Sequence, residues 1–195
     1  MRTLRSPFRT VRARLADLRA ARAGMSTVEF ALVAPVFVLL IAGTVDFGFA
    51  LHKRFEIGSA LSAGANYALL RAEDVNAENA ATLAGQIAAV VAGNAGSGEI
   101  TVTVNVNNSR SVTIAGGEAN VGEGDASADV CYCPVRNSDG VFWGASVSCG
   151  GTCPAGGTAG KFVAIEIAKA HDPLFSAVTP EALQSVSLST FLQAQ

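Results

Sequence analysis

The feature that most constrains this chain of 195 residues is a long apolar stretch near its N-terminus. Sixteen residues from Phe30 to Val45 carry no charge, and apolar residues resume after Asp46 as far as Leu51. A helix from Val28 to Leu51 would be about 36 Å long at ~1.5 Å per residue, enough to cross the ~30 Å hydrocarbon core of a bilayer. The sequence therefore predicts one membrane-spanning helix.

The charges of the chain are distributed asymmetrically around this stretch. Residues 1–24 contain seven arginines and one acid, a net charge of +6, whereas the rest contains seven basic and fifteen acidic groups, a net charge of −8. Arginine-rich flanks stay on the cytoplasmic side of a membrane. We expect a cytoplasmic N-terminus and an external C-terminal domain. The apolar stretch follows directly and no nucleic-acid-binding signature occurs, so we expect no nucleic-acid partner.

An acidic residue, Glu29, stands at the start of the apolar stretch, where a carboxylate is costly. Three interpretations are open. The stretch is a secretory signal cleaved after residues 48–50, or it is an anchor that is never cleaved. In the third, cleavage after Gly24 removes the basic leader and leaves a free amine on Met25. That ammonium and the Glu29 carboxylate could pair between neighbouring helices and fix their axial register.

The segment STVEFALVAPVFVLLIAGTVDFGFAL resembles the TadE-like pseudopilins of tight-adherence (Tad, or Flp) pilus systems. The family pattern is a glycine, a short spacer, Glu-Phe, an apolar run with a proline, and then Asp-Phe-Gly. The matching residues are Gly24, Glu29, Phe30, Pro35, Asp46, Phe47 and Gly48. The chain departs from the pattern at Asn66, where most relatives have an arginine.

This resemblance implies a minor pseudopilin or accessory subunit of pilus assembly for surface adhesion. A prepilin peptidase would cleave between Gly24 and Met25, Glu29 would set subunit register, and Pro35 would bend the helix. Asp46, Phe47 and Gly48 would mark the membrane edge. The implied partners are other pilins, the inner-membrane assembly platform, the peptidase and the lipid bilayer. The alternative is an uncleaved, single-pass envelope or binding protein unrelated to pili.

The expected organisation is a leader (1–24), a transmembrane helix (25–51), a helical spine (52–95) and a β-rich periplasmic head domain (96–195). Within the spine, Ala60, Gly64 and Ala68 form a stripe of small residues. The stripe serves either close approach of another helix or packing of this helix on its own head domain. Asp74 and Asn76 are candidate caps for a second helix.

The C-terminal half changes to the alternation that is typical of half-buried strands. Residues 100–106 and 111–115 are expected to form a hairpin, and 161–170 and 183–193 to form further antiparallel strands of a small sheet. The glycine-rich, acidic segment 115–129 is expected to be a loop, and its spacing matches no EF-hand calcium site. The predicted fold class is therefore α+β, with a long N-terminal helix and a small antiparallel sheet.

All four cysteines lie within 23 residues; they are Cys131, Cys133, Cys149 and Cys153. An even number of cysteines in an external domain favours two disulfides, and bridges between the two clusters avoid a strained Cys131–Cys133 loop. A four-thiolate zinc site is a rival, although zinc knuckles usually have C-x2-C spacing. Free thiols are the third alternative.

The sequence contains no recognisable catalytic constellation. There is no phosphate-binding glycine loop, no G-x-S-x-G and no H-E-x-x-H. The two histidines, His52 and His171, are expected at the surface or at an interface. We expect a protein that is not an enzyme and needs no cofactor or metal.

Overall fold

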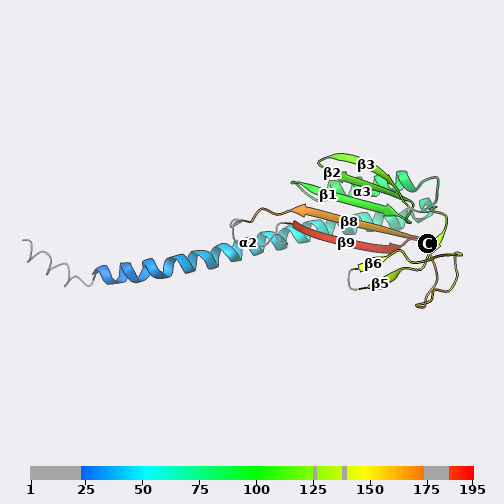
Figure 1. Cartoon of the computed structure of the whole chain (residues 1–195). Helices are drawn as coiled ribbons and strands as arrows, with labels where there is room; N and C mark the ends of the chain where they lie inside the picture. Colours follow the sequence, from blue (N-terminus) through cyan, green and yellow to red (C-terminus); the bar gives the residue numbers. More distant parts are fainter. Residues whose placement is uncertain (1–22, 125–126, 138–139, 174–184) are drawn as a thin grey trace, which may run out of the picture. The chain divides into compact units, whose positions relative to one another are not determined.

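The computed structural model describes residues 23–124, 127–137, 140–173 and 185–195 (Figure 1). The chain divides into two compact units, Met1–Phe47 and Gly48–Gln195. Most of the expected basic leader, residues 1–22, lies outside the described residues. In the first unit, the structure therefore describes only the N-terminal part of one helix.

Helix α2 (Ala23–Leu70) contains Pro35 and continues through it. Proline has no N–H to donate to the carbonyl four residues earlier, but one missing bond among many is tolerated in a long apolar helix. From Thr27 to Leu70, α2 is long and apolar enough to cross a membrane by length and composition. The predicted long N-terminal helix is confirmed.

The larger sheet of the second unit has five antiparallel strands in the order β3-β2-β1-β8-β9 (Figure 1). Its strands are β1 (Ile100–Val106), β2 (Arg110–Ala115), β3 (Glu118–Glu123), β8 (Phe162–Ala170) and β9 (Ser185–Gln193). The predicted hairpin and the two later strands are confirmed. The alternation of apolar and polar residues has put the valines and isoleucines on one face. The α+β fold class is therefore correct.

The core of the second unit lies between this apolar sheet face and two helical segments. These are the part of α2 from Ile57 onward and α3 (Ala80–Asn94). A short 3-10 helix, η1 (Ala72–Asp74), lies between them in the sequence. The large apolar side chains that are fully buried are Ile57, Val75, Leu83, Ile87, Val91, Val102, Val104, Val106, Val163, Ile165 and Ile167.

The stripe of small residues on α2 packs inside this core. Ala60 and Ala68 are fully buried, and a Cβ on Gly64 would collide with a Val91 methyl group and touch Ile165. The absence of a side chain at Gly64 therefore lets α2 approach α3 and β8 closely. Of the two interpretations of the stripe, the structure supports packing of the helix on the chain's own sheet.

Two local predictions were wrong. The segment expected to be a loop contains β3, whose residues are mostly exposed at an edge of the sheet. An edge strand with little burial needs no apolar alternation, so its sequence looks like a loop. The helix start was also misplaced, because Asn79 directly precedes α3, while Asp74 pairs with Arg71 and caps no helix. The Asn76 side chain does cap the turn that leads into α3, since it accepts hydrogen bonds from the Glu78 and Asn79 amides.

A buried asparagine connects the sheet to the cysteine-rich segment. Asn107 follows β1 with a left-handed backbone (φ 49°), which asparagine tolerates better than most residues. Its side-chain nitrogen donates to the carbonyls of Ala128 (2.9 Å) and Val130 (2.7 Å), and its oxygen accepts from the Phe162 amide (3.1 Å). The side chain is thus fully hydrogen-bonded and fixes the start of the cysteine-rich segment beside β8.

Candidate functional site

The residues that carry the N-terminal motif lie on one helix of the first unit. The backbone of Gly24 and Met25 is in the first described turns of α2, and Glu29 and Pro35 follow on the same helix. Met25 and Glu29 are four residues apart and therefore share a face of the helix. The chemistry of cleavage and register stays a prediction, because the described residues include no partner helix.

Glu29 is exposed at the start of the stretch of α2 from Phe30 to Val45, which carries no charge. Large exposed side chains follow it along the next five turns; they are Phe30, Leu32, Val33, Val36, Phe37, Val38, Leu39, Leu40, Ile41, Val45 and Phe47. An apolar surface of this extent is not left in water by a soluble domain. The segment therefore fits a single-pass membrane anchor by length and composition.

The Asp46-Phe47-Gly48 motif lies at the division between the two units, which falls after Phe47. Asp46 is half-buried and Phe47 is exposed, while a Cβ on Gly48 would meet no atom within 4 Å. Among the residues that the structure describes, no packing contact requires glycine at position 48. The assignment of the motif to a membrane edge stays a prediction.

The cysteines form two disulfides, both between the clusters as the sequence predicted. Cys131 is bonded to Cys149 and Cys133 to Cys153, with Cα–Cα distances of 4.9 and 5.5 Å. Cys131 lies in β4 (Cys131–Tyr132), which pairs with β7 (Ser146–Val147), so the Cys131–Cys149 bond connects β4 to the residues just after β7. A second short ladder, of β5 (Val135–Asn137) with β6 (Gly140–Phe142), lies between the two cysteine clusters in the sequence. Both zinc and free thiols are excluded for these four residues, since disulfide sulfurs cannot act as thiolate ligands.

An aromatic cluster joins this disulfide-bonded region to the large sheet. Trp143 packs between Tyr132 and Phe191, with ring centroids 5.5 and 4.8 Å away, and Phe191 stacks on Phe162 at 5.1 Å. Aromatic contacts of this kind stabilise by about 0.5–1.5 kcal/mol each beyond area burial. The cluster holds the disulfide-bonded region against β8 and β9.

A buried ion pair links α2 to the end of β8. Lys169 is only 3% exposed, and its Nζ donates to Glu56 Oε2 at 2.5 Å and to the Ala95 carbonyl at 2.7 Å. The hydrogen bond from Lys169 lowers the pKa of Glu56 below its usual value, and the positive charges of Lys169, His52 and Lys53 act in the same direction, against a smaller opposing effect of desolvation. The carboxylate therefore stays ionised into the acidic range.

The histidines are not close to a nucleophile motif, but one expectation about them was wrong. His52 is exposed as predicted, whereas His171 is buried beside the end of β8. Among the described residues, no group of three or more His, Cys, Asp or Glu side chains is arranged to hold a metal ion. The described residues thus assemble no site for metal-based chemistry.

These features define a class of protein: one apolar N-terminal helix that fits a single-pass membrane anchor, continuous with a disulfide-bonded α+β domain. Residues 24–66 match the sequence model of the family described as TadE-like protein. The predicted resemblance is confirmed over this segment, which includes Gly24, Glu29, Pro35 and Asp46. No curated protein and no solved structure matches the chain.

The family match supports association of the protein with a Tad-type pilus. That family is a family of pilus components rather than of known enzymes, and it implies partners of the pilin type in general. The matched segment ends at residue 66, within α2. The whole of the large sheet, the disulfides and the aromatic cluster therefore lie outside the matched segment.

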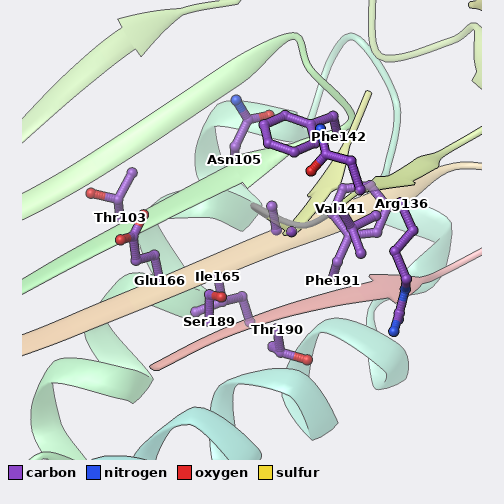
Figure 2. A pocket seen from close by; sticks show the side chains of 13 residues that line it. Thr103, Asn105, Arg136, Val141, Phe142, Ile165, Glu166, Ser189, Thr190 and Phe191 are labelled. Atoms are coloured by element: carbon purple, nitrogen blue, oxygen red, sulfur yellow. The ribbon is translucent and has the colours of Figure 1, made fainter. Parts of the chain in front are cut away.

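Sequence reasoning missed the two features that depend on distant residues. Glu56 and Lys169 are 113 positions apart, and no local pattern announces their pairing. The groove that β5 and β6 form with the large sheet was missed for the same reason (Figure 2). The sequence did contain one indication of the buried ion pair: Lys169 lies in phase with the apolar residues of β8, which places it on the buried face of the strand.

Proposed function

We propose that this protein is a minor pseudopilin or accessory subunit of Tad (Flp) pilus assembly, processed by a prepilin peptidase after Gly24. The observation that carries the proposal is the helix with Gly24, Glu29, Pro35 and Asp46-Phe47-Gly48 in the family spacing. Its partners are other pilins or pseudopilins, the inner-membrane assembly platform and the lipid bilayer. Its role is structural and not catalytic.

The proposed organisation is the one expected from sequence. Residues 1–24 are a leader on the cytoplasmic side, 25–51 span the inner membrane, 52–95 form a helical spine and 96–195 form a periplasmic head domain. Two disulfides support the last assignment, because they persist in oxidising compartments. A head of this size suits a minor or accessory subunit, since a bare helix is sufficient to build a thin fibre.

The proposed mechanism of assembly centres on the new N-terminus. Cleavage after Gly24 leaves the ammonium of Met25 one helical turn before the Glu29 carboxylate. Each charge is costly near lipid, and an ion pair between adjacent subunits offsets both costs. Only one axial offset between two helices brings these groups together. The pair therefore selects one axial register between the helices of adjacent subunits. Their apolar surfaces alone would pack about equally well at many axial positions.

Gly24→Ala is expected to leave the leader attached, because the peptidase requires the small, flexible residue before the cut. Intact mass and N-terminal sequencing of the membrane fraction measure this directly, with the wild-type chain starting at Met25. Gly43→Ala is the matched control, since a Cβ at Gly43 meets no atom within 4 Å and leaves the motif unchanged.

The same measurement separates the alternatives. A wild-type chain that starts at Met1 in cells with an active prepilin peptidase would contradict the proposal and support an uncleaved anchor. A wild-type chain that starts at Leu51 would support a secretory signal cleaved after residues 48–50.

Glu29→Gln is expected to be processed normally but to assemble poorly, because the Met25 ammonium loses its counter-ion. Loss of a pair in a low-dielectric setting is worth at least about 1.4 kcal/mol, so we expect at least about tenfold less cross-linking to pilin partners. The control is Glu78→Gln, at an exposed residue ahead of α3. Wild-type levels of cross-linking in Glu29→Gln would rule out the register mechanism.

A further inference from the structure

A groove crosses the face of the large sheet that is opposite the helices (Figure 2). Its volume is about 590 Å³, within the range of about 300–1,000 Å³ that is usual for small-molecule sites. Strands β1, β8 and β9 form its floor, and the β5–β6 ladder forms one wall. All of its lining residues belong to the second unit.

The strand register explains why the floor is hollow. Asn105, Ala164 and Phe191 face one another across β1, β8 and β9, and Thr103, Glu166 and Ser189 form the neighbouring row. The small side chain of Ala164 leaves a depression between Asn105 and Phe191. The groove is therefore a property of the paired strands and not of one loop.

Polar groups with unused hydrogen-bonding capacity surround this depression. The Asn105 side-chain oxygen accepts from the Asn108 amide at 2.9 Å, which fixes the side chain and leaves its nitrogen to donate. Glu166 is exposed and offers two acceptor oxygens, while Arg136 offers donors from the wall. In the described part of the chain, neither Glu166 nor Arg136 belongs to an ion pair.

Two phenylalanines add apolar surfaces beside these polar groups. Phe191 is held by its stacking on Phe162 and its contact with Trp143. Phe142 projects from β6 on the wall and is 46% exposed. Figure 2 shows Phe142, Phe191 and Asn105 among the side chains that line the groove. An exposed ring next to fixed amide and carboxylate groups suits a ligand with both an apolar face and a polar edge.

The lining excludes several classes of ligand. A lipid chain would bury the Glu166 carboxylate and the Asn105 side-chain nitrogen without partners. A phosphate would meet the Glu166 carboxylate as well as Arg136. Strand addition by an extended peptide is excluded at β1 and β8, which are paired on both sides, but not at β9, which is an edge strand of the sheet. A pyranose fits, because its C–H face packs on aromatic rings while its neighbouring hydroxyls donate to a carboxylate and accept from an amide.

We propose that this groove binds a neutral saccharide, with Phe142 and Phe191 against the sugar ring and Asn105, Glu166 and Arg136 bonded to hydroxyls. None of these residues lies in the segment Ala23–Phe47. The inference is therefore independent of the proposed role in pilus assembly, and each can fail without the other.

The test is titration of the full chain with methyl glycosides of glucose, galactose, mannose and N-acetylglucosamine, and with cellobiose and lactose. Binding is followed by saturation-transfer NMR and calorimetry in a detergent without a sugar headgroup. Glycosidic detergents would themselves compete for the groove. We expect at least one of these probes to bind with its ring protons closest to the protein.

Phe142→Ala and Glu166→Ala are each expected to weaken that binding about tenfold, the effect of one aromatic contact or one charge-assisted hydrogen bond. Both residues are exposed, so the variants should fold. The matched controls are Val121→Ala and Glu118→Ala, exposed residues of β3 outside the groove. No binding of any probe, or binding that both groove variants leave unchanged, would overturn the proposal.

Discussion

Replacing Glu56 by glutamine is expected to destabilise the second unit strongly, because it leaves the Lys169 ammonium buried without a counter-ion. A buried ammonium in that position costs roughly 3–5 kcal/mol. The Ala95 carbonyl remains 2.7 Å from Nζ, and the Glu56 side chain is 30% exposed, so water reaches the site. We therefore expect the lower end of this range.

Unfolding in urea, followed by the fluorescence of Trp143, measures the effect. Trp143 is the single tryptophan of the chain and lies in the second unit. Glu99→Gln, an exposed residue ahead of β1, is the control and should change the free energy of unfolding by less than about 0.5 kcal/mol. Lys169→Met should cost less than Glu56→Gln, since the remaining carboxylate is accessible to water. Equal stability of Glu56→Gln and the wild type would contradict the role of the pair.

The pair also predicts a dependence of stability on pH. The pKa of Glu56 is lower in the folded state than its usual value of 4.5, because of the hydrogen bond and the charge of Lys169. A carboxyl group with a lowered folded-state pKa contributes stability above its unfolded pKa and loses this contribution as the pH falls through the folded value. Below about pH 4.5, the wild type should therefore lose stability more steeply than Glu56→Gln.

Removing either disulfide is expected to lower the free energy of unfolding by roughly 3 kcal/mol. The bridged cysteines are 18 and 20 residues apart, and each bond restricts the conformational entropy of the loop between them in the unfolded chain. The variants are the double replacements of Cys131 with Cys149 and of Cys133 with Cys153, all by alanine. The two loops overlap, so one bridge already restrains most of the other loop. Loss of both bridges should therefore cost more than the sum of the two single losses, because each bridge compensates for the absence of the other.

Exposure predicts the order in which the bridges are reduced. Cys149 is exposed, whereas Cys133 and Cys153 are both buried. A mild reductant should therefore open Cys131–Cys149 first, and alkylation followed by mass spectrometry identifies the labelled pair. Preferential labelling of Cys133 and Cys153 would contradict this order. Four labelled thiols in folded protein before any reductant is added would contradict the disulfides themselves.

The features that the sequence predicted well are those whose signal is local. The apolar run before Asp46 indicates a long helix, and the valines of 100–106 indicate a strand because neighbouring side chains alternate in burial. Clustered cysteines indicate cross-links, although spacing alone left their connectivity open. The N-terminal motif was recognisable because its residues lie on one continuous helix.

The features that the sequence did not predict depend on contacts between strands and helices that are distant in the sequence, or on a strand's place in the sheet. Strand β3 is almost fully exposed, so its sequence does not show the alternation of apolar and polar residues that identifies a half-buried strand. No local pattern indicates the partner of Lys169, because its position in β8 directs it into the core, where it meets Glu56 of α2, 113 positions away in the sequence. The groove needs Ala164 in register with Asn105 and Phe191 and a wall from another ladder. None of these relations exists before the chain has folded.

The edge position of β3 has a consequence for how copies of this protein meet. Two β3 strands that paired antiparallel about a twofold axis, over their full length, would place Glu118 of each copy opposite Glu123 of the other. Like charges directly opposite each other destabilise such a ladder, and Arg110, which pairs with Glu123 at 2.5 Å, neutralises only one member of each couple. The edge thus repels its own copy. Where many copies are crowded on a membrane, this repulsion guards their sheets against fusing into a continuous aggregate.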